Sequence, residues 1–488
     1  MKFHGFSRII LCICILTLLS AAVPVHAAYD TALEQTIIQS CINNKPADLA
    51  QYDLSEEELE ALFMELSYGG KLPWYAQDSY RYSFNDNGQI LEFYPEYLSE
   101  EEYDRVLYET RVAEVIAEAV HAGMSQWQKA LAVHDYLIAN TCYDESYTYY
   151  DGYDLLVRGT AVCEGYSEAY MDIMNRLGVP CIMVISNDMD HSWNLVNLEG
   201  SWYHVDLTWD DPYSDVYGQV LHDYFLLTDQ EMHDDHQARL ADGEEGHYNW
   251  ITDLVCDDET YCDAFWKEVD SQICYLDSYT SYLRREKDWD SCLYLRDEAT
   301  GSETRLFTDE EEYIDVGSGK YSYEHLGLSL WNGRLYFSST DTVYSMALDG
   351  SDVEKEYMHD TKKETSFIYS CFVKNDTLYL TLSDHDFNET TKEVALPATG
   401  YHVHKYTQTE IHATCLEDGQ FSRLCSCGIY VQLPAERATG HNYESITEVR
   451  ATLFRPGRTR YTCTGCQDTY TSVVPRLSFL EWLFSFLL

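Results

Sequence analysis

The stretch of sequence that decides the fold is VCEGYSEAY at residues 162–170, followed by HSWNLV from His191 and by WYHVDLTWDDP from Trp202. These segments carry, in order, the thiol of Cys163, the imidazole of His191 and the carboxylate of Asp206. A cysteine nucleophile needs these three groups, because a base must take up its proton and an acid must orient the base. The sequence therefore predicts a catalytic triad of Cys163, His191 and Asp206.

Cys163 is predicted to lie in the first turn of a helix. Apolar residues recur at helical spacing from Tyr166, and the pattern stops at Gly178. Free backbone N–H groups and the positive end of the helix dipole lie at a helix start, and both favour a thiolate. The adjacent carboxylate of Glu164 opposes the thiolate, so a cationic partner is required. We assign that part to His191.

A hairpin is predicted to bring the imidazole and the carboxylate together. Residues 191–198 and 201–209 read as two strands, joined by Glu199-Gly200. A two-residue loop places His191 and Asp206 on one face as diagonal neighbours, about 7–8 Å apart at the backbone. A loop with an odd number of residues would place them on opposite faces.

Each member of the predicted triad has a chemical role. The Cys163 thiolate would attack the carbonyl carbon of a carboxamide, and His191 would pass the thiol proton to the departing ammonia or amine. Asp206 would fix the imidazole tautomer and favour its charged form. The backbone N–H of Cys163, free at the helix start, is expected to stabilise the oxyanion. His204, on the strand face of Asp206, is the alternative base, with no evident route to Cys163.

Residues 127 to about 236 resemble the transglutaminase-like superfamily of bacterial cysteine enzymes. The resemblance rests on KALAVHDYLIANTCYD, GTAVCEGYSEAY, HSWNLVNLEGSWYHVDLTWDDP and HDYFLLTDQEM, which follow in the family's order and span under a quarter of the chain. It implies a papain-like α/β core, in which a helix carries Cys163 as nucleophile and a sheet carries His191 as base and Asp206 as the third member. No cofactor and no catalytic metal are implied.

Members of that superfamily cross-link glutamine to lysine, deamidate glutamine or cleave peptide bonds. All three reactions pass through one thioester, so the resemblance implies cysteine-dependent acyl transfer on a protein or peptide amide. The sequence does not select among them. The alternative is a surface adhesion or scaffold protein that keeps the fold but has lost activity. The intact triad disfavours it, because an inactive descendant has no chemical reason to keep all three residues.

The first 27 residues read as a secretory signal. Lys2 and Arg8 precede an apolar run at residues 9–19, and Val25-His26-Ala27 supplies a small-residue cleavage site. The protein is therefore expected to be secreted or associated with the cell surface. No later stretch has the roughly 18 consecutive apolar residues that a spanning helix needs, and the apolar tail at residues 477–488 is too short.

The chain is strongly acidic, with a formal net charge of -51 and a pI near 4.4. Like charges repel, so neither nucleic acid nor an anionic membrane is an expected partner. A cationic protein or peptide substrate would be attracted. Acidic runs such as residues 309–312 could hold calcium, but a solvated charge run is the preferred interpretation. No feature predicts an oligomeric state.

The chain is predicted to have an α+β organisation, with the catalytic domain at residues 124–245. Residues 28–123 form a helical N-terminal region, with capping-box starts at Ser55 and at Ser99 with Glu102, and a later capping box begins at Ser125. Residues 265–395 read as short alternating strands. In them a Leu-Tyr pair recurs at intervals of about 40 residues, which resembles propeller blades. Three units are fewer than a closed propeller uses, so a β-meander domain is expected. The recurring pairs are Leu293-Tyr294, Leu335-Tyr336 and Leu378-Tyr379.

Residues 396–476 are predicted to form two small cysteine-bearing β repeats. PATG at residues 397–400 returns as RATG at residues 437–440, and these repeats resemble those at the ends of exported bacterial surface proteins. These cysteines could either form disulfides or bind zinc. We favour disulfides, because the C-x-C spacing is irregular for zinc and Leu453 stands where a cysteine would align. The zinc sets considered are Cys415, Cys425 and Cys427 with His404 or His441, and Cys425, Cys427, Cys463 and Cys466.

Overall fold

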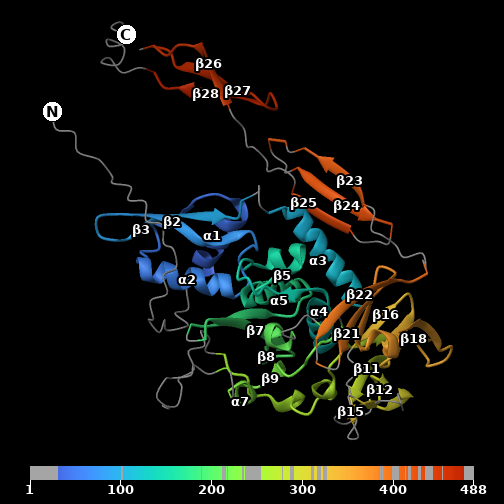
Figure 1. The fold of residues 1–488 in the computed structure, drawn as a ribbon. Coiled ribbons are helices and arrows are strands. Elements are labelled where there is room, and N and C mark those ends of the chain that lie inside the picture. Colours follow the sequence, from blue (N-terminus) through green and yellow to red (C-terminus); the bar gives the residue numbers. More distant parts are fainter. Residues whose placement is uncertain are drawn as a thin grey trace. The chain divides into compact units, whose positions relative to one another are not determined.

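The computed structural model forms two compact units, Met1–Tyr401 and His402–Leu488, which are taken one at a time below (Figure 1). The predicted signal, the apolar tail, the acidic run at 309–312 and the residues His404, Cys427 and His441 lie outside the described part of the chain. The structure describes residues 31–99, 103–187, 189–211, 216, 218–233, 236, 254–276, 279–285, 291–308, 313–315, 320–322, 327–384, 386, 388–397, 406–412, 414–415, 419–426, 430–434, 443–452 and 454–476.

The N-terminal region contains a sheet as well as helices, so the prediction of a helical region is wrong in part. Tyr80 and Tyr82 alternate with more exposed neighbours along one strand and are buried, which is the two-residue period of a sheet face. The ring of Phe63, on the second helix, lies 4.6 Å from that of Tyr80. The elements are α1 (Thr31–Asn43), α2 (Glu56–Tyr68), β1 (Ala47–Asp48), β2 (Ala76–Phe84) and β3 (Ile90–Tyr97), with sheet order β1-β3-β2.

The central region places helices against a four-stranded antiparallel sheet. Helix α5 contacts strands β6 and β7 on one side and helix α4 on another. The helices are α3 (Arg105–Ala119), α4 (Gln126–Asn140), the π-helix η1 (Asp154–Arg158), α5 (Cys163–Arg176), α6 (Leu207–Asp210) and α7 (Asp229–Met232). The sheet runs β6 (Cys181–Ser186), β7 (His191–Leu198), β8 (Ser201–Val205) and β9 (Phe225–Leu227), and β4 (Cys142–Tyr143) pairs in parallel with β5 (Thr160–Ala161).

Helix starts follow the predicted capping chemistry. Ser55 and Ser125 cap α2 and α4 in the predicted capping boxes. Glu102 of the third predicted box lies outside the described residues, and α3 is capped by Asp104. None of the helices in the described ranges is long and apolar enough to cross a membrane.

The hairpin of β7 and β8 has the predicted register. Leu198 pairs with Ser201, and Glu199 and Gly200 both take the positive φ of a tight two-residue turn. The predicted extent of the second strand is wrong, because β8 ends at Val205. Asp206 instead caps helix α6, and its carboxylate accepts from the backbone N–H groups that follow it.

The later part of the first unit consists of separate antiparallel sheets, each made of consecutive strands as in a meander. At Asn332-Gly333 both residues take positive φ, which gives a tight hairpin turn between β16 and β17. The sheets are β10 (Cys274–Leu276) to β13 (Glu303–Thr308) through β11 (Tyr279–Arg285) and β12 (Ser291–Asp297); β14 (Tyr313–Asp315) with β15 (Lys320–Ser322); β16 (Leu328–Trp331), β17 (Arg334–Ser338), β18 (Thr342–Ala347) and β19 (Glu354–Met358); and β20 (Ser366–Lys374), β21 (Thr377–Asp384) and β22 (Glu389–Ala395). Short helices are η2 (Glu259–Tyr261), η3 (Phe265–Glu268) and α8 (Thr361–Glu364).

The second unit has two three-stranded antiparallel sheets of the same strand order. The first is built from β23 (Tyr406–Ile411), β24 (Gln420–Cys425) and β25 (Tyr430–Pro434), and the second from β26 (Tyr443–Val449), β27 (Gly457–Cys463) and β28 (Thr469–Val474). Most side chains of β23, β26 and β28 are exposed. Cys415, Cys425 and Cys463 are buried in this unit, whereas Cys466 is exposed.

Candidate active site

Helix α5 begins at Cys163, so this residue lies in the first turn as predicted, although the pattern favoured a start near Thr160, where strand β5 lies. The thiol is partly buried, and no side chain caps the helix at Val162, so the first turn presents its backbone N–H groups. A β-carbon at Gly165 would lie 2.7 Å from the carbonyl oxygen of Asp151 and 2.5 Å from the β-carbon of Ala161. The absence of a side chain at Gly165 therefore lets the preceding loop pack directly on the turn that carries the thiol.

His191 and Asp206 are hydrogen bonded, with Nε2 of the ring 2.6 Å from Oδ2 of the carboxylate. Because an ionised carboxylate can only accept, Nε2 carries the proton and Nδ1 is the nitrogen left for Cys163. Burial lowers the pKa of the ring, but the charge of Asp206 and hydrogen bonds with Asp206 and Cys163 outweigh it and raise the pKa of His191 to about 10. Asp206 therefore bonds the His191 ring directly, and the Cys163 thiol lies close enough to that ring to raise its pKa.

A second histidine, His236, shares the same carboxylate. Its Nε2 lies 2.9 Å from Oδ2 of Asp206, and its side chain is fully buried. Burial would raise the pKa of Asp206, but the positive charge of His191 and hydrogen bonds with both histidines lower it below its ordinary range. Sequence reasoning missed His236, because no spacing pattern links it to Asp206.

The other oxygen of Asp206 is held by the backbone. Oδ1 accepts from the N–H groups of Thr208 at 3.0 Å and Trp209 at 3.2 Å. The His191 ring lies between two indoles, with its centroid 5.7 Å from that of Trp193 and 5.7 Å from that of Trp209. Both ends of the His191–Asp206 pair are therefore fixed in orientation by neighbours that do not titrate.

His204, the alternative base, is engaged elsewhere. Its Nδ1 accepts from the indole N–H of Trp193 at 2.9 Å, and its Nε2 lies 2.9 Å from Oδ1 of Asp229. The side chain is fully buried, and burial lowers the pKa of its ring. Both ring nitrogens of His204 are committed to these partners, which leaves neither for Cys163.

A second buried network lies behind the site and joins α4 to α6. His134 contacts Asp135 through Nδ1 and Asp210 through Nε2, each at 3.0 Å, and His222 contacts Asp135 at 3.1 Å. Asp210 also accepts from the backbone N–H of Tyr224. Burial opposes a charge on His134, but its two carboxylate partners raise its pKa to about 9. Since Asp210 belongs to the helix that Asp206 caps, this network anchors that helix.

The carboxyl group of Glu164, the residue after Cys163, belongs to a cluster of three carboxyl groups. Oxygen atoms of Asp78, Glu164 and Glu168 lie within 4.8 Å of one another. Burial first, and then the charges of Asp78 and Asp151, raise the pKa of Glu164 to about 7. Below that pH Glu164 is mostly neutral, so it opposes a neighbouring thiolate much less than the sequence alone suggests.

Comparison with known proteins identifies the region that holds this site. The family model of the transglutaminase-like superfamily matches residues 113–207. Among solved structures, a protein described as a TGase is 17% identical, and the match covers 26% of this chain and 42% of that chain with a TM-score of 0.21. This chain therefore spans less than half the length of that protein. Among curated proteins, none matches the sequence.

Two further solved structures are similar over a larger share of the chain. The N-terminal domain of Nup159 is 10% identical over 61% of this chain and 76% of that chain, with a TM-score of 0.16. A putative TolB from Agrobacterium tumefaciens is 9% identical over 60% of this chain and 80% of that chain, with a TM-score of 0.19. TM-scores this low do not establish a shared fold. The family match stands without them, and residues 113–207 form a transglutaminase-like domain.

Proposed function

We propose that this protein is a cysteine-dependent acyltransferase or amide hydrolase. Cys163 is its nucleophile, His191 its general base and acid, and Asp206 the residue that orients His191. The observation that carries the proposal is the 2.6 Å hydrogen bond between His191 and Asp206, together with the Cys163 thiol that raises the pKa of the same ring from the first turn of a helix. The substrate class is a protein or peptide carboxamide, and the acidic surface favours a cationic one.

The proposed reaction has two halves. The Cys163 thiolate forms a bond to the carbonyl carbon, and the carbonyl electrons move to the oxygen beside the backbone N–H groups of the first helical turn. When the C–N bond breaks, the His191 imidazolium gives its proton to the departing ammonia or amine, which leaves a thioester. Water or a primary amine then attacks the thioester. His191 takes the attacking group's proton, and the thiolate leaves, so the ion pair is restored.

Three assays on one purified protein distinguish cross-linking, deamidation and proteolysis. A glutamine-containing peptide is incubated with and without a primary amine, and ammonia release, amine incorporation and peptide cleavage are followed separately. Incorporation indicates cross-linking, ammonia alone indicates deamidation, and new termini indicate proteolysis. No turnover in any assay, together with alkylation of Cys163 no faster than of other cysteines, would favour the inactive scaffold, which no feature of the described residues supports.

Export is a further part of the proposal, and it rests on the basic, apolar and small-residue segments of residues 1–27.

The activity is expected to persist to unusually high pH. Because the pKa of His191 is raised to about 10, its proton is retained from acid pH up to about pH 10 and is lost above it. The ion pair with Cys163 is lost with that proton, so kcat/KM should fall as pH rises through about 10. A pH profile of kcat/KM measures this fall, which forms the alkaline limb of the profile. In Asp206→Asn, which removes the charge that raises the pKa, the limb should move down toward the ordinary histidine value of about 6.5. An unshifted limb would contradict the assignment.

His236 is expected to act as a positioning residue. His236→Phe removes one N–H donor from Asp206 while keeping a buried ring, and kcat should fall about tenfold to a hundredfold, as for other residues that orient a catalytic group. KM should stay unchanged, because His236 is fully buried and hydrogen bonds to Asp206. His236→Gln keeps a donor and should recover most of kcat. Equal losses in both variants would indicate a packing role alone.

A further inference from the structure

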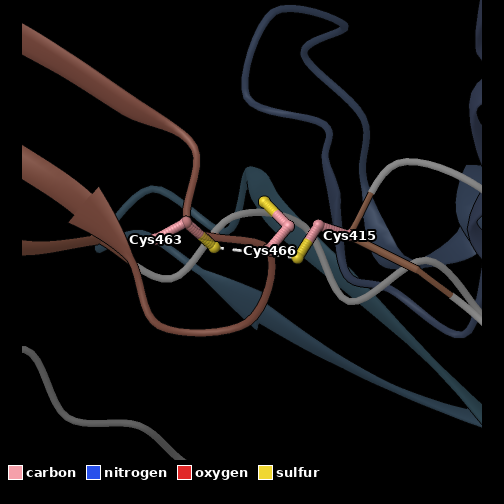
Figure 2. A group of neighbouring side chains, drawn as sticks. All are labelled: Cys415, Cys463 and Cys466. Atoms are coloured by element: carbon pink, nitrogen blue, oxygen red, sulfur yellow. Dashed lines mark hydrogen bonds between the residues drawn. The ribbon is translucent and has the colours of Figure 1, made fainter.

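Three thiols of the second unit lie together although they come from different sheets. The Sγ atoms of Cys415 and Cys463 are 3.7 Å apart, and the Sγ atoms of Cys415, Cys463 and Cys466 all lie within 4.8 Å of one another. Cys415 belongs to the segment between β23 and β24, whereas Cys463 ends β27 and Cys466 lies in the turn before β28. Figure 2 shows the three side chains gathered where the two segments meet.

The turn at Gly465 leaves room for the sulfur of Cys415 beside Cys463 and Cys466. A β-carbon at Gly465 would lie 2.9 Å from Sγ of Cys415, which is closer than such atoms approach. Any other residue at Gly465 would therefore push the Cys415 thiol away from the turn that carries Cys463 and Cys466. Cys415 and Cys463 are buried, and Cys466 is exposed. The cluster thus has an inner pair of thiols and an outer one.

The distance between the inner pair fits a shared metal ion and not a covalent bond between them. A disulfide requires about 2.05 Å between its sulfur atoms. A zinc–sulfur bond is about 2.3 Å long, so two corners of a tetrahedral zinc site lie about 3.8 Å apart. The observed 3.7 Å, at which one thiol can also donate to the other, matches the spacing of two ligands on one zinc ion.

Among its described residues, the second unit has few buried apolar side chains. The hydrophobic clusters found in the described ranges all belong to the first unit. Below about 40 residues per sheet unit, disulfides or a metal usually replace an apolar core. The buried side chains of the second unit, as far as it is described, are Cys415, Cys425, Val431, Thr459 and Cys463.

We propose that Cys415, Cys463 and Cys466 bind one Zn²⁺ ion that joins the two sheets of the second unit. Zinc displaces the three thiol protons to solvent, forms three Zn–S bonds and takes a water molecule on the exposed side as its fourth ligand, so neither an oxidant nor a reductant is required. This ligand set crosses from one repeat to the other and differs from both sets considered from the sequence.

Metal content of the full-length protein tests the proposal. Protein purified under reducing conditions and reloaded with Zn²⁺ should retain about one zinc ion per chain after removal of free metal. Cys415→Ser should lose that ion. Cys425→Ser changes a buried cysteine of the same unit and should retain it, and Cys163→Ala should also retain it. Zinc that persists in Cys415→Ser, or is lost in either control, would overturn the assignment.

Alkylation of the unmodified chain gives a test that does not depend on how the variants fold. Cys466 is exposed, so as a free thiol it should react readily with iodoacetamide. With zinc bound, its modification, measured by peptide mass spectrometry, should slow at least about tenfold, and a chelator should restore it. Equal rates with and without zinc, or a disulfide among the three cysteines in the zinc-loaded protein, would disprove the site.

Discussion

Replacing Cys163 with alanine is expected to lower kcat at least about 10⁴-fold, because losing the nucleophile of a triad leaves only the binding and oxyanion contributions. The free energy of unfolding should change by less than about 1 kcal/mol, since the thiol is partly exposed and alanine suits a helix start. Steady-state assays give the first quantity, and urea unfolding followed by circular dichroism gives the second. Iodoacetamide should modify Cys163 in the unaltered protein faster than any other cysteine.

Cys142→Ala is the matched control for this variant. Cys142 is also a partly buried thiol of the central region, but it belongs to strand β4 and not to the helix start. Its removal should leave kcat within about twofold. Activity that survives Cys163→Ala, or is lost equally in both variants, would refute the role given to the first thiol.

Replacing Asp206 is expected to affect both catalysis and stability. Asp206→Asn keeps the shape of the side chain but cannot accept from both histidines, so His191 loses its orientation and kcat should fall about 10³–10⁴-fold. Asp206→Ala should in addition destabilise the fold by about 3–5 kcal/mol. Two buried histidines lose their acceptor, and helix α6 loses its cap. Urea unfolding of both variants separates the two effects.

Asp229→Asn controls for the general cost of removing a histidine-paired carboxylate. Asp229 accepts from His204 and from the backbone N–H of Cys256, much as Asp206 accepts from histidine and backbone donors. It has no contact with His191 among the bonds of the described residues. The control should lose stability but keep kcat within about threefold. A loss of kcat as large as that of Asp206→Asn would mean that loosening of the sheet, and not orientation of His191, explains the result.

Local signals predicted those parts of the site that depend on neighbours in sequence. The position of Cys163 in the first turn of α5 follows from apolar spacing, and the register of β7 and β8 follows from the two-residue turn at Glu199-Gly200. The predicted extent of β8 was wrong, because Asp206 is also a good helix cap. Its side chain caps α6, and such capping competes with strand pairing.

The rest of the site depends on contacts between residues far apart in the chain. His236 contacts Asp206 across a separation of 30 residues, and His222 contacts Asp135 across a separation of 87 residues. Neither contact has a spacing rule that a sequence can show. The burial that raises the pKa of Glu164 likewise comes from tertiary packing, so its charge state could not be inferred from its position beside Cys163.

The orientation of Asp206 depends on the end of β8, on the backbone N–H groups of α6 and on its hydrogen bond with His236. A nascent chain therefore carries Cys163 as one of sixteen ordinary thiols. On the proposed mechanism, chemical reactivity appears with the finished fold, which protects the polypeptide from acylating itself during synthesis. The burst of product in an active-site titration would then count correctly folded molecules in a preparation, independently of its total protein content.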